Sequence, residues 1–175
     1  PQFGDLNVYG QDYPEFIRSF PPAEALPYLS DVAQLENLEH LAYYAPDSII
    51  LSLENAPQYL PQILEGHLTL GLAESVQLIK SVFPILSLKQ FMDAGAEGDF
   101  DIDGPGEAIC VWRLGYKIEF MSLKAPDYTF LKAVADGKGL NNALELTLIE
   151  DNAFNFETFW AEMLNYELFT VQTIE

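Results

Sequence analysis

The fold is decided by the segment EAICVWRLGYKIEFMSL, residues 107–123. Two apolar runs flank Leu114-Gly115, and glycine in a two-residue connection is typical of a β-hairpin because it accepts φ > 0. This turn predicts three cross-strand pairs on one apolar face: Arg113 with Tyr116, Val111 with Ile118, and Ile109 with Phe120. The opposite face carries Cys110, Trp112, Lys117 and Glu119. A slip by one residue would move Lys117 and Glu119 into the core, so the predicted register is self-consistent.

Three helices are predicted after the hairpin. The first spans 127–136 and ends at Gly137, the second spans 140–148, and the third begins after Asn155. Asn155 is a favoured N-cap, and Phe154 and Phe159 have the spacing of a hydrophobic staple. Residues 168–174 are expected to form a strand that closes the sheet. A hairpin followed by three helices is the topology of a small winged-helix-like module.

The chain before the hairpin is predicted to be helical at first and mixed later. Helices punctuated by proline are expected at 12–17, 27–45 and 48–53, with residues 55–58 as a linker. The second helix carries an apolar stripe made of Tyr28, Val32, Leu35, Leu38, Ala42 and Ala45. The next expected elements are strands at 67–71 and 76–80, a helix at 85–92 and a loop rich in Gly and Asp at 93–106. The prediction is therefore an α+β fold, with a helical domain at 1–62 and an α/β module at 63–175 that holds a small antiparallel sheet and three C-terminal helices.

The composition allows a packed core and limits the classes of partner. Of the 175 residues, 49% are hydrophobic and 20% are charged, which suits one large domain or two small ones. The net charge of −19 reflects a scarcity of bases, because eight Lys and Arg stand against 27 Asp and Glu. A protein that neutralises about 6–10 phosphates needs a clustered basic face. The charge therefore argues against nucleic acid and against an anionic membrane surface, and leaves open a basic peptide, a basic protein patch or a neutral apolar ligand.

No constellation of catalytic residues stands out in the sequence. His40 is expected to be solvated opposite the apolar stripe and His67 to be structural, so a metal site with nitrogen ligands is not expected. Residues 99–104, DFDIDG, match the opening of a calcium loop, but the twelfth position holds Cys110 instead of Glu. We expect a solvated acidic loop, with calcium binding assisted by Glu107 as the alternative. Cys110 is the only cysteine and is expected to be an inert packing residue whose thiol pKa is raised.

Two further features each allow two interpretations. Asp31 lies within the apolar stripe and is expected to be a first-turn carboxylate favoured by the helix dipole, with a buried anchor for a neighbouring backbone as the alternative. The helix pair joined by residues 136–139 is similar to a helix-turn-helix. Its candidate recognition segment, 140–145, has no Arg to read bases, and only Lys138 is placed for a phosphate. DNA binding is therefore kept as an alternative function.

Segments in order along the chain resemble one protein family. They are Tyr9-Gly10, 13–17 (YPEFI), 26–36 (LPYLSDVAQLE), Ala42-Tyr43, 75–85 (SVQLIKSVFPI), 111–115 (VWRLG) and 130–137 (FLKAVADG). This pattern is similar to that of the HvfC/BufC family of bufferin-maturation partner proteins, often labelled DNA-binding and related to the partner protein of methanobactin synthesis. Family members usually carry an additional helical segment before this pattern. The chain begins at Pro1-Gln2-Phe3 without Met, and we expect it to be a shortened relative or a trimmed product.

The resemblance implies a non-catalytic partner protein without a cofactor. Such a protein binds a TIM-barrel multinuclear iron oxidase and presents a ribosomal precursor peptide for modification. Its C-terminal module is similar to peptide-recognition elements that hold a leader peptide as an added strand, a mode that needs an open sheet edge and apolar pockets. On this basis the predicted peptide-binding residues are Val111, Arg113, Tyr116, Ile118, Phe120, Phe159 and Met163. The alternative is that these side chains simply form the core of the module.

Two other functions remain as hypotheses at this point. A helix-turn-helix-like transcriptional regulator would bind duplex DNA with a steep salt dependence. An enzyme would depend on the incomplete calcium loop and on Cys110. We expect no enzymatic activity and no metal. A cytoplasmic location is expected because a single cysteine suits a reducing compartment and no signal peptide is present.

Overall fold

The computed structural model describes residues 10–173, and all structural statements below concern this range. The expected chain start, Tyr9 of the family-like pattern and the last residue of the strand expected at 168–174 lie outside it. The described chain contains helices α1 Tyr13–Ser19, α2 Leu29–Tyr44, α3 Ala56–Leu64, α4 Ile85–Asp93, α5 Ala125–Ala135, α6 Gly139–Glu150 and α7 Phe156–Asn165, the short 3-10 helix η2 Pro21–Ala23, and strands β1 Leu68–Leu72, β2 Gln77–Ser81, β3 Glu107–Leu114, β4 Lys117–Leu123 and β5 Phe169–Thr173. The predicted α+β class is confirmed.

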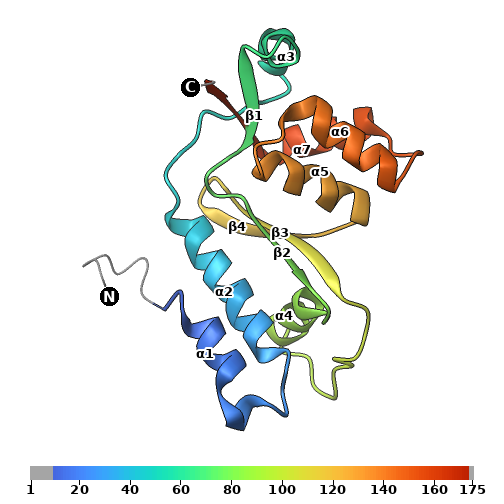
Figure 1. The fold of residues 1–175 in the computed structure, drawn as a ribbon. Helices are drawn as coiled ribbons and strands as arrows, with labels where there is room; N and C mark the ends of the chain where they lie inside the picture. The colour runs from blue at the N-terminus through green and yellow to red at the C-terminus, as the bar shows by residue number, and fades with distance from the viewer. Residues whose placement is uncertain (1–9, 174–175) are drawn as a thin grey trace.

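The strands form two small antiparallel sheets (Figure 1). One sheet has the order β2-β3-β4, and the other pairs β1 with β5. The strand expected at 168–174 is present as β5, but it does not close the sheet of the hairpin. It pairs with β1 instead, because Leu168 and Phe169 are drawn into the core and Phe169 stacks on Trp160 at a centroid distance of 5.0 Å.

The hairpin is present, but its predicted register is wrong by two residues. Arg113 pairs with Ile118 and Val111 with Phe120, so the two-residue turn is Gly115-Tyr116 and not Leu114-Gly115. Gly115 has φ +62° at the first position of this turn, which is where a type II′ turn requires glycine. Because side chains alternate with a period of two, the shift leaves the predicted faces unchanged.

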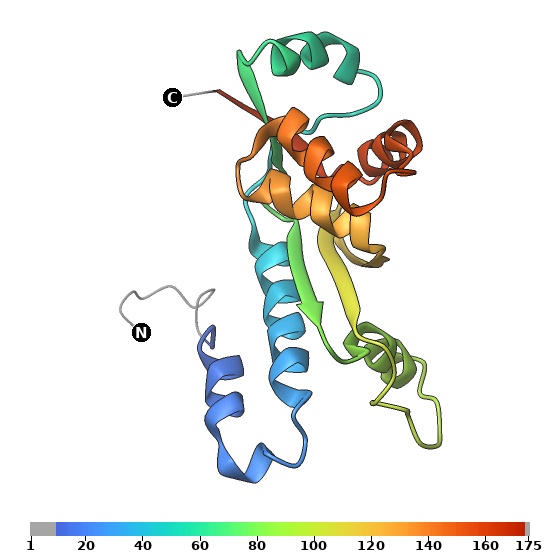
Figure 2. The same cartoon turned by 45° about the vertical axis from the view of Figure 1, so that its right-hand side comes forward.

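Both faces of the three-stranded sheet are covered. Ile109 and Val111 of β3 point to one face, where they form the small core with Leu35, Ala42, Ile85 and Leu86 of α2 and α4. Cys110 and Trp112 point to the opposite face, into the large core that includes residues of α5, α6, α7, β1 and β5. Figures 1 and 2 show α2 running along the sheet, with α5 to α7 gathered towards the other sheet. β3 is therefore a central strand buried on both faces.

The predicted helix at 27–45 is confirmed as α2, whose stripe residues Leu35, Leu38 and Ala42 are buried. The helix expected at 48–53 is absent. Ile50 instead forms a β-bridge to Thr170, whose Oγ1 donates to the Ile49 carbonyl at 2.7 Å. The linker expected at 55–58 is the first turn of α3, because Pro57 stands near the N-terminus of the helix, where proline is favoured.

The remaining elements follow the expectations closely. α4, α5 and α6 begin and end within a few residues of the predicted bounds, and α7 begins directly after Asn155 as predicted. The Asn155 side chain accepts a hydrogen bond from the Thr158 N–H at 3.0 Å, as expected of an N-cap. The rings of Phe154 and Phe159 lie 5.1 Å apart, which confirms the hydrophobic staple. Among the described residues no helix is both long enough and apolar enough to cross a bilayer.

Candidate functional site

The structure does not bring the seven predicted peptide-binding residues together on one surface. Val111 is buried in the small core, with the partly buried Ile118 and Phe120 of β4 beside it. Phe159 and Met163 of α7 are buried in the large core, on the opposite side of the sheet. Three of the seven side chains therefore pack as core, which is the alternative weighed from the sequence.

The outward-facing part of the predicted site is β4 and the hairpin tip. Tyr116 is 97% exposed at the tip. Within residues 10–173, β4 pairs with β3 alone, so its outer edge keeps unpaired backbone N–H and C=O groups. Ile118 and Phe120 are partly exposed on one face of this edge, and Met121 is partly exposed on the other. This combination of a free edge and alternating apolar side chains is what strand addition requires.

A cation–π contact with Lys89 links Phe120 to α4. The Nζ of Lys89 lies 5.2 Å from the centre of the Phe120 ring and within 3.4 Å of carboxylate oxygens of Glu39 and Asp93. Partial burial lowers the pKa of Lys89, but the two carboxylates outweigh this effect and raise the pKa above its ordinary value. Lys89 therefore stays charged, and it holds the Phe120 face of β4 against α4.

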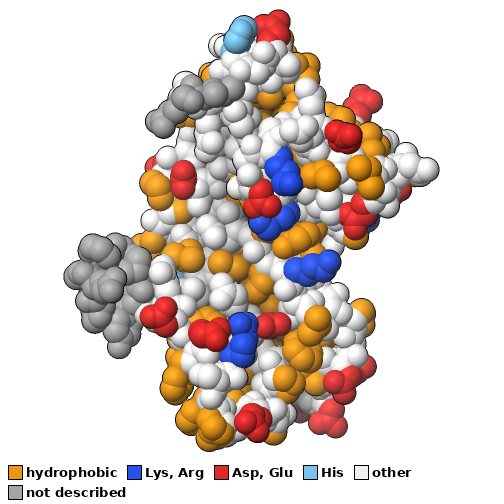
Figure 3. Space-filling model, in the orientation of Figure 1, with side chains coloured by type: hydrophobic (Ala, Val, Ile, Leu, Met, Phe, Trp, Pro, Cys, Tyr) orange, Lys and Arg blue, Asp and Glu red, His pale blue; other side chains and the backbone are white. Residues whose placement is uncertain are grey.

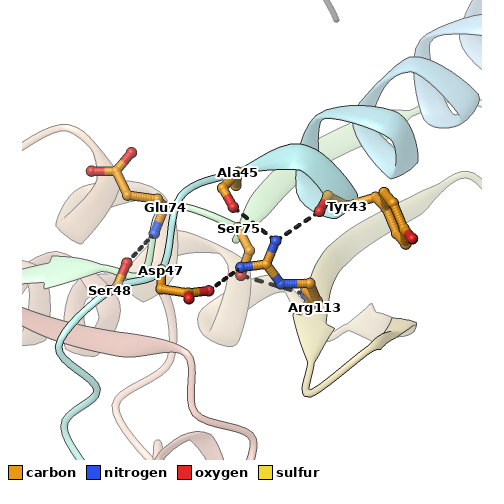
Figure 4. Close-up of polar contacts among 7 residues, drawn as sticks. All are labelled: Tyr43, Ala45, Asp47, Ser48, Glu74, Ser75 and Arg113. Carbon is orange, nitrogen blue, oxygen red and sulfur yellow. Dashed lines mark hydrogen bonds and ion pairs between the residues drawn. The ribbon is translucent and has the colours of Figure 1, made fainter.

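Arg113 does not point to the β4 edge but clamps the end of α2 (Figure 4). One guanidinium nitrogen donates to the backbone carbonyls of Tyr43 and Ala45, each at 2.7 Å, and the other donates to Asp47 at 2.7 Å. The last carbonyls of a helix have no partner within the helix, and a cation is favourable there. The Arg113 side chain is 17% exposed, whereas that of Asp47 is 99% exposed. The two carbonyl contacts are therefore the stronger part of the clamp.

The clamp extends into the neighbouring loop. The Glu74 N–H donates to Ser48 Oγ at 2.8 Å, which ties the chain after α2 to the β1–β2 loop. Arg113 also borders a small cavity of about 230 Å³, with Asp47 and Glu167 on its wall. Because its donors already face carbonyl and carboxylate oxygens, Arg113 serves as a structural cross-link between α2 and β3.

Two carboxylates, Glu107 and Asp31, hold segments that lie far from them in the sequence, and the sequence patterns predicted neither partner. Glu107, at the start of β3, accepts from the Leu86 N–H at 2.7 Å and from the Ser87 N–H at 3.3 Å, so it caps the N-terminus of α4. Asp31 accepts from Ser81 Oγ at 2.6 Å at the end of β2. Asp31 lies in the first turn of α2, as expected from the helix dipole. Its partner on β2 is a side-chain hydroxyl, so the alternative of a buried anchor for a neighbouring backbone is not what the structure shows. The capping role of Glu107 had no sequence signal, because its partners lie about twenty residues earlier.

The groups considered for catalysis are separated from one another. His67 is exposed and lies 3.4 Å from Glu65. His40 is partly buried rather than solvated, its ring packs 4.7 Å from that of Tyr44, and its Nε2 is buried without a partner in the described range. Cys110 is buried, and burial raises the pKa of its thiol as expected. Between residues 10 and 173, no three His, Cys, Asp or Glu side chains are grouped to hold a metal ion.

The helix pair α5–α6 carries little that suits DNA. The exposed positions of α6 include Asn142, Glu145, Leu146 and Ile149, which are polar, acidic or apolar. Lys138 is exposed in the connecting turn, and Lys132 of α5 is paired with Asp136. A surface of this kind lacks the basic groups that phosphate binding requires.

Comparison with known proteins adds no assignment. A scan against protein-family models and a search of curated proteins found no match to this chain.

Proposed function

We propose that this chain is a non-catalytic partner protein that binds a multinuclear iron oxidase and presents a ribosomal precursor peptide to it. The observation that carries the peptide-binding part is the free outer edge of β4, flanked by partly exposed apolar side chains on both faces. The oxidase rests on the family resemblance. The winged-helix-like arrangement rests on the order of hairpin and helices, and the cytoplasmic location on the single cysteine; both belong to the same proposal.

The edge of β4 supplies both elements of strand recognition. Its unpaired backbone groups hydrogen-bond an extended peptide whatever the sequence of the peptide, and the neighbouring side chains select which residues are accepted. Ile118 and Phe120 receive every second peptide side chain on one face, and Met121 receives the alternate ones on the other. The buried Val111 supports the small core behind Ile118 and Phe120, and Phe159 and Met163 help to form the large core on the opposite face.

The charge of the chain favours a basic peptide. Across the full sequence, 27 carboxylates against eight bases produce a negative potential that attracts cations at a distance. The same potential opposes duplex DNA. A mobility shift that appears at about 50 mM salt and falls steeply with added salt would favour the regulator hypothesis over this proposal.

Hydrogen exchange tests strand addition directly. We expect the precursor peptide encoded beside the oxidase gene to slow amide exchange in β4, because new inter-strand hydrogen bonds protect N–H groups. Ile118→Ser should weaken binding, whereas Ile149→Ser on the exposed face of α6 is a matched control and should leave binding unchanged. Peptide binding without protection of β4, or no complex with oxidase and peptide at micromolar concentration, would contradict the proposal.

A further inference from the structure

A groove between α1 and α2 lies apart from the β4 edge. The two helices run antiparallel and side by side in Figures 1 and 2. The groove has a volume of about 510 Å³ and is lined by Asp12, Tyr13, Phe16, Glu36 and His40, together with small and amide residues. Aromatic rings and carboxylates therefore lie side by side along this groove.

The α1 side of the groove continues as a row of exposed aromatic rings. Tyr13, Phe16 and Phe20 are 56%, 55% and 43% exposed. The rings of Tyr13 and Phe16 stack at 6.2 Å, and those of Phe16 and Phe20 at 5.2 Å. Single exposed apolar residues are common on protein surfaces, but a contiguous apolar patch marks an interaction site. In Figure 3 hydrophobic side chains gather over this end of the molecule.

The charge around the groove is almost entirely negative. Residues 10–44, which contain α1 and α2, carry six carboxylates and a single base, Arg18. Of the six, Glu39 is paired with Lys89 of α4. Arg18 lies 3.0 Å from Glu15 and 4.0 Å from Asp31, so its charge is compensated locally. Aromatic faces also attract cations. The groove is thus complementary to a surface that is both apolar and basic.

We propose that the α1–α2 groove docks a basic amphipathic helix of a partner protein. The apolar side of that helix covers Tyr13, Phe16 and Phe20, and its Lys or Arg side chains face Asp12 and Glu36. A second copy of this chain is a poor occupant, because it brings the same carboxylates and a net charge of −19 to the interface. The proposal does not depend on peptide binding at β4, because it uses neither that strand nor its edge.

Titration with a designed peptide tests the proposal on the full chain. The probe is a labelled amphipathic peptide of about 20 residues, above the length of about 12–15 residues below which isolated helices are marginal in water, with Leu on one face and Lys on the other. A second peptide carries Glu in place of Lys. We expect fluorescence anisotropy to detect binding of the Lys peptide that weakens with added salt, and no binding of the Glu peptide.

Matched variants locate the binding. Phe16→Ser and, separately, Glu36→Gln should weaken the Lys peptide, with Phe16→Ser weakening it about tenfold or more, because a central aromatic contact dominates an interface. Ile149→Ser and Glu145→Gln remove the same kinds of group from α6 and should change nothing. Circular dichroism verifies folding, and Glu36→Gln decides the outcome if Phe16→Ser unfolds.

Three results would overturn the proposal. Equal losses in the α6 controls would mean that the peptide binds through net charge alone. A dimer in sedimentation that Phe16→Ser dissociates would assign the groove to a second copy. Peptide binding that occurs only after deletion of residues 1–9 would assign the groove to the chain's own N-terminal segment.

Discussion

Replacement of Arg113 by methionine should destabilise the protein by loosening the end of α2. Methionine keeps much of the aliphatic stem but removes the donors to the Tyr43 and Ala45 carbonyls, both at 2.7 Å. Breaking a hydrogen bond that involves a charged group costs about 1.5–3 kcal/mol. The ion pair to Asp47 adds little, because its carboxylate is 99% exposed. Allowing for water that reaches the freed carbonyls, we expect a loss of about 2–4 kcal/mol in the free energy of unfolding.

Urea denaturation followed by circular dichroism measures this loss. The midpoint should fall while the slope with denaturant stays unchanged, because the folded state keeps its buried area. Arg113→Lys should lie between wild type and Arg113→Met, since an ammonium cannot span three acceptors as a planar guanidinium does. Asp47→Asn should have no measurable effect. A loss below about 0.5 kcal/mol for Arg113→Met, within the range of ordinary surface substitutions, would refute the clamp.

Three further outcomes follow from the packing. Asn155→Ala should cost about 1 kcal/mol in urea denaturation through loss of the helix cap, and an unchanged midpoint would contradict the cap. Gly106→Ala places a Cβ against the Ser81 carbonyl oxygen and 2.8 Å from Val82 Cα, and should cost about 1–3 kcal/mol. Gly104→Ala, with its nearest atom at 3.4 Å, should cost less. Burial raises the pKa of the Cys110 thiol in the folded protein. Above about pH 8.5 the unfolded chain therefore loses this proton while the folded protein still keeps it, and the free energy of unfolding falls as the pH rises. The stability advantage of wild type over Cys110→Ala should therefore narrow above that pH, and a thiol reagent should label Cys110 only after unfolding.

Helices and strands were predicted well where the residues that stabilise them lie close together in the sequence. Asn155 was identifiable as an N-cap because its side chain accepts a hydrogen bond from the N–H of Thr158, only three residues later. The two faces of the hairpin were predictable because alternation survives a shift by two residues. The register itself was not, because Gly115 suits either the first or the second position of a two-residue turn, and only the pairing in the sheet selects one.

Long-range partners account for the elements and contacts that the sequence did not reveal. Ile50 is extended because it bridges Thr170, a residue 120 positions later. Arg113 was predicted to bind a peptide, yet its acceptors include the backbone carbonyls of Tyr43 and Ala45. Every residue carries such a carbonyl, so no residue type marks these positions in advance. The burial of Phe159 and Met163 opposite Val111 likewise depends on which face of the sheet α7 covers, and helical periodicity is silent on that choice.

A protein that presents a peptide to an enzyme must hold both at a fixed distance and orientation. Small displacements from a reactive arrangement strongly lower the rate of the chemical step. α2 would meet this requirement if the helix that docks in the α1–α2 groove belongs to the oxidase, because α2 joins that groove to the sheet whose edge strand is β4. One side of α2 lines the groove with Glu36 and His40, and its buried stripe packs on β3 through the small core. Arg113 then fixes its last turn to the strand that pairs with β4. An Arg113→Met protein that still binds each probe separately but no longer supports peptide modification would therefore locate the coupling in the clamp, whereas unaltered modification would show that α2 needs no such fastening.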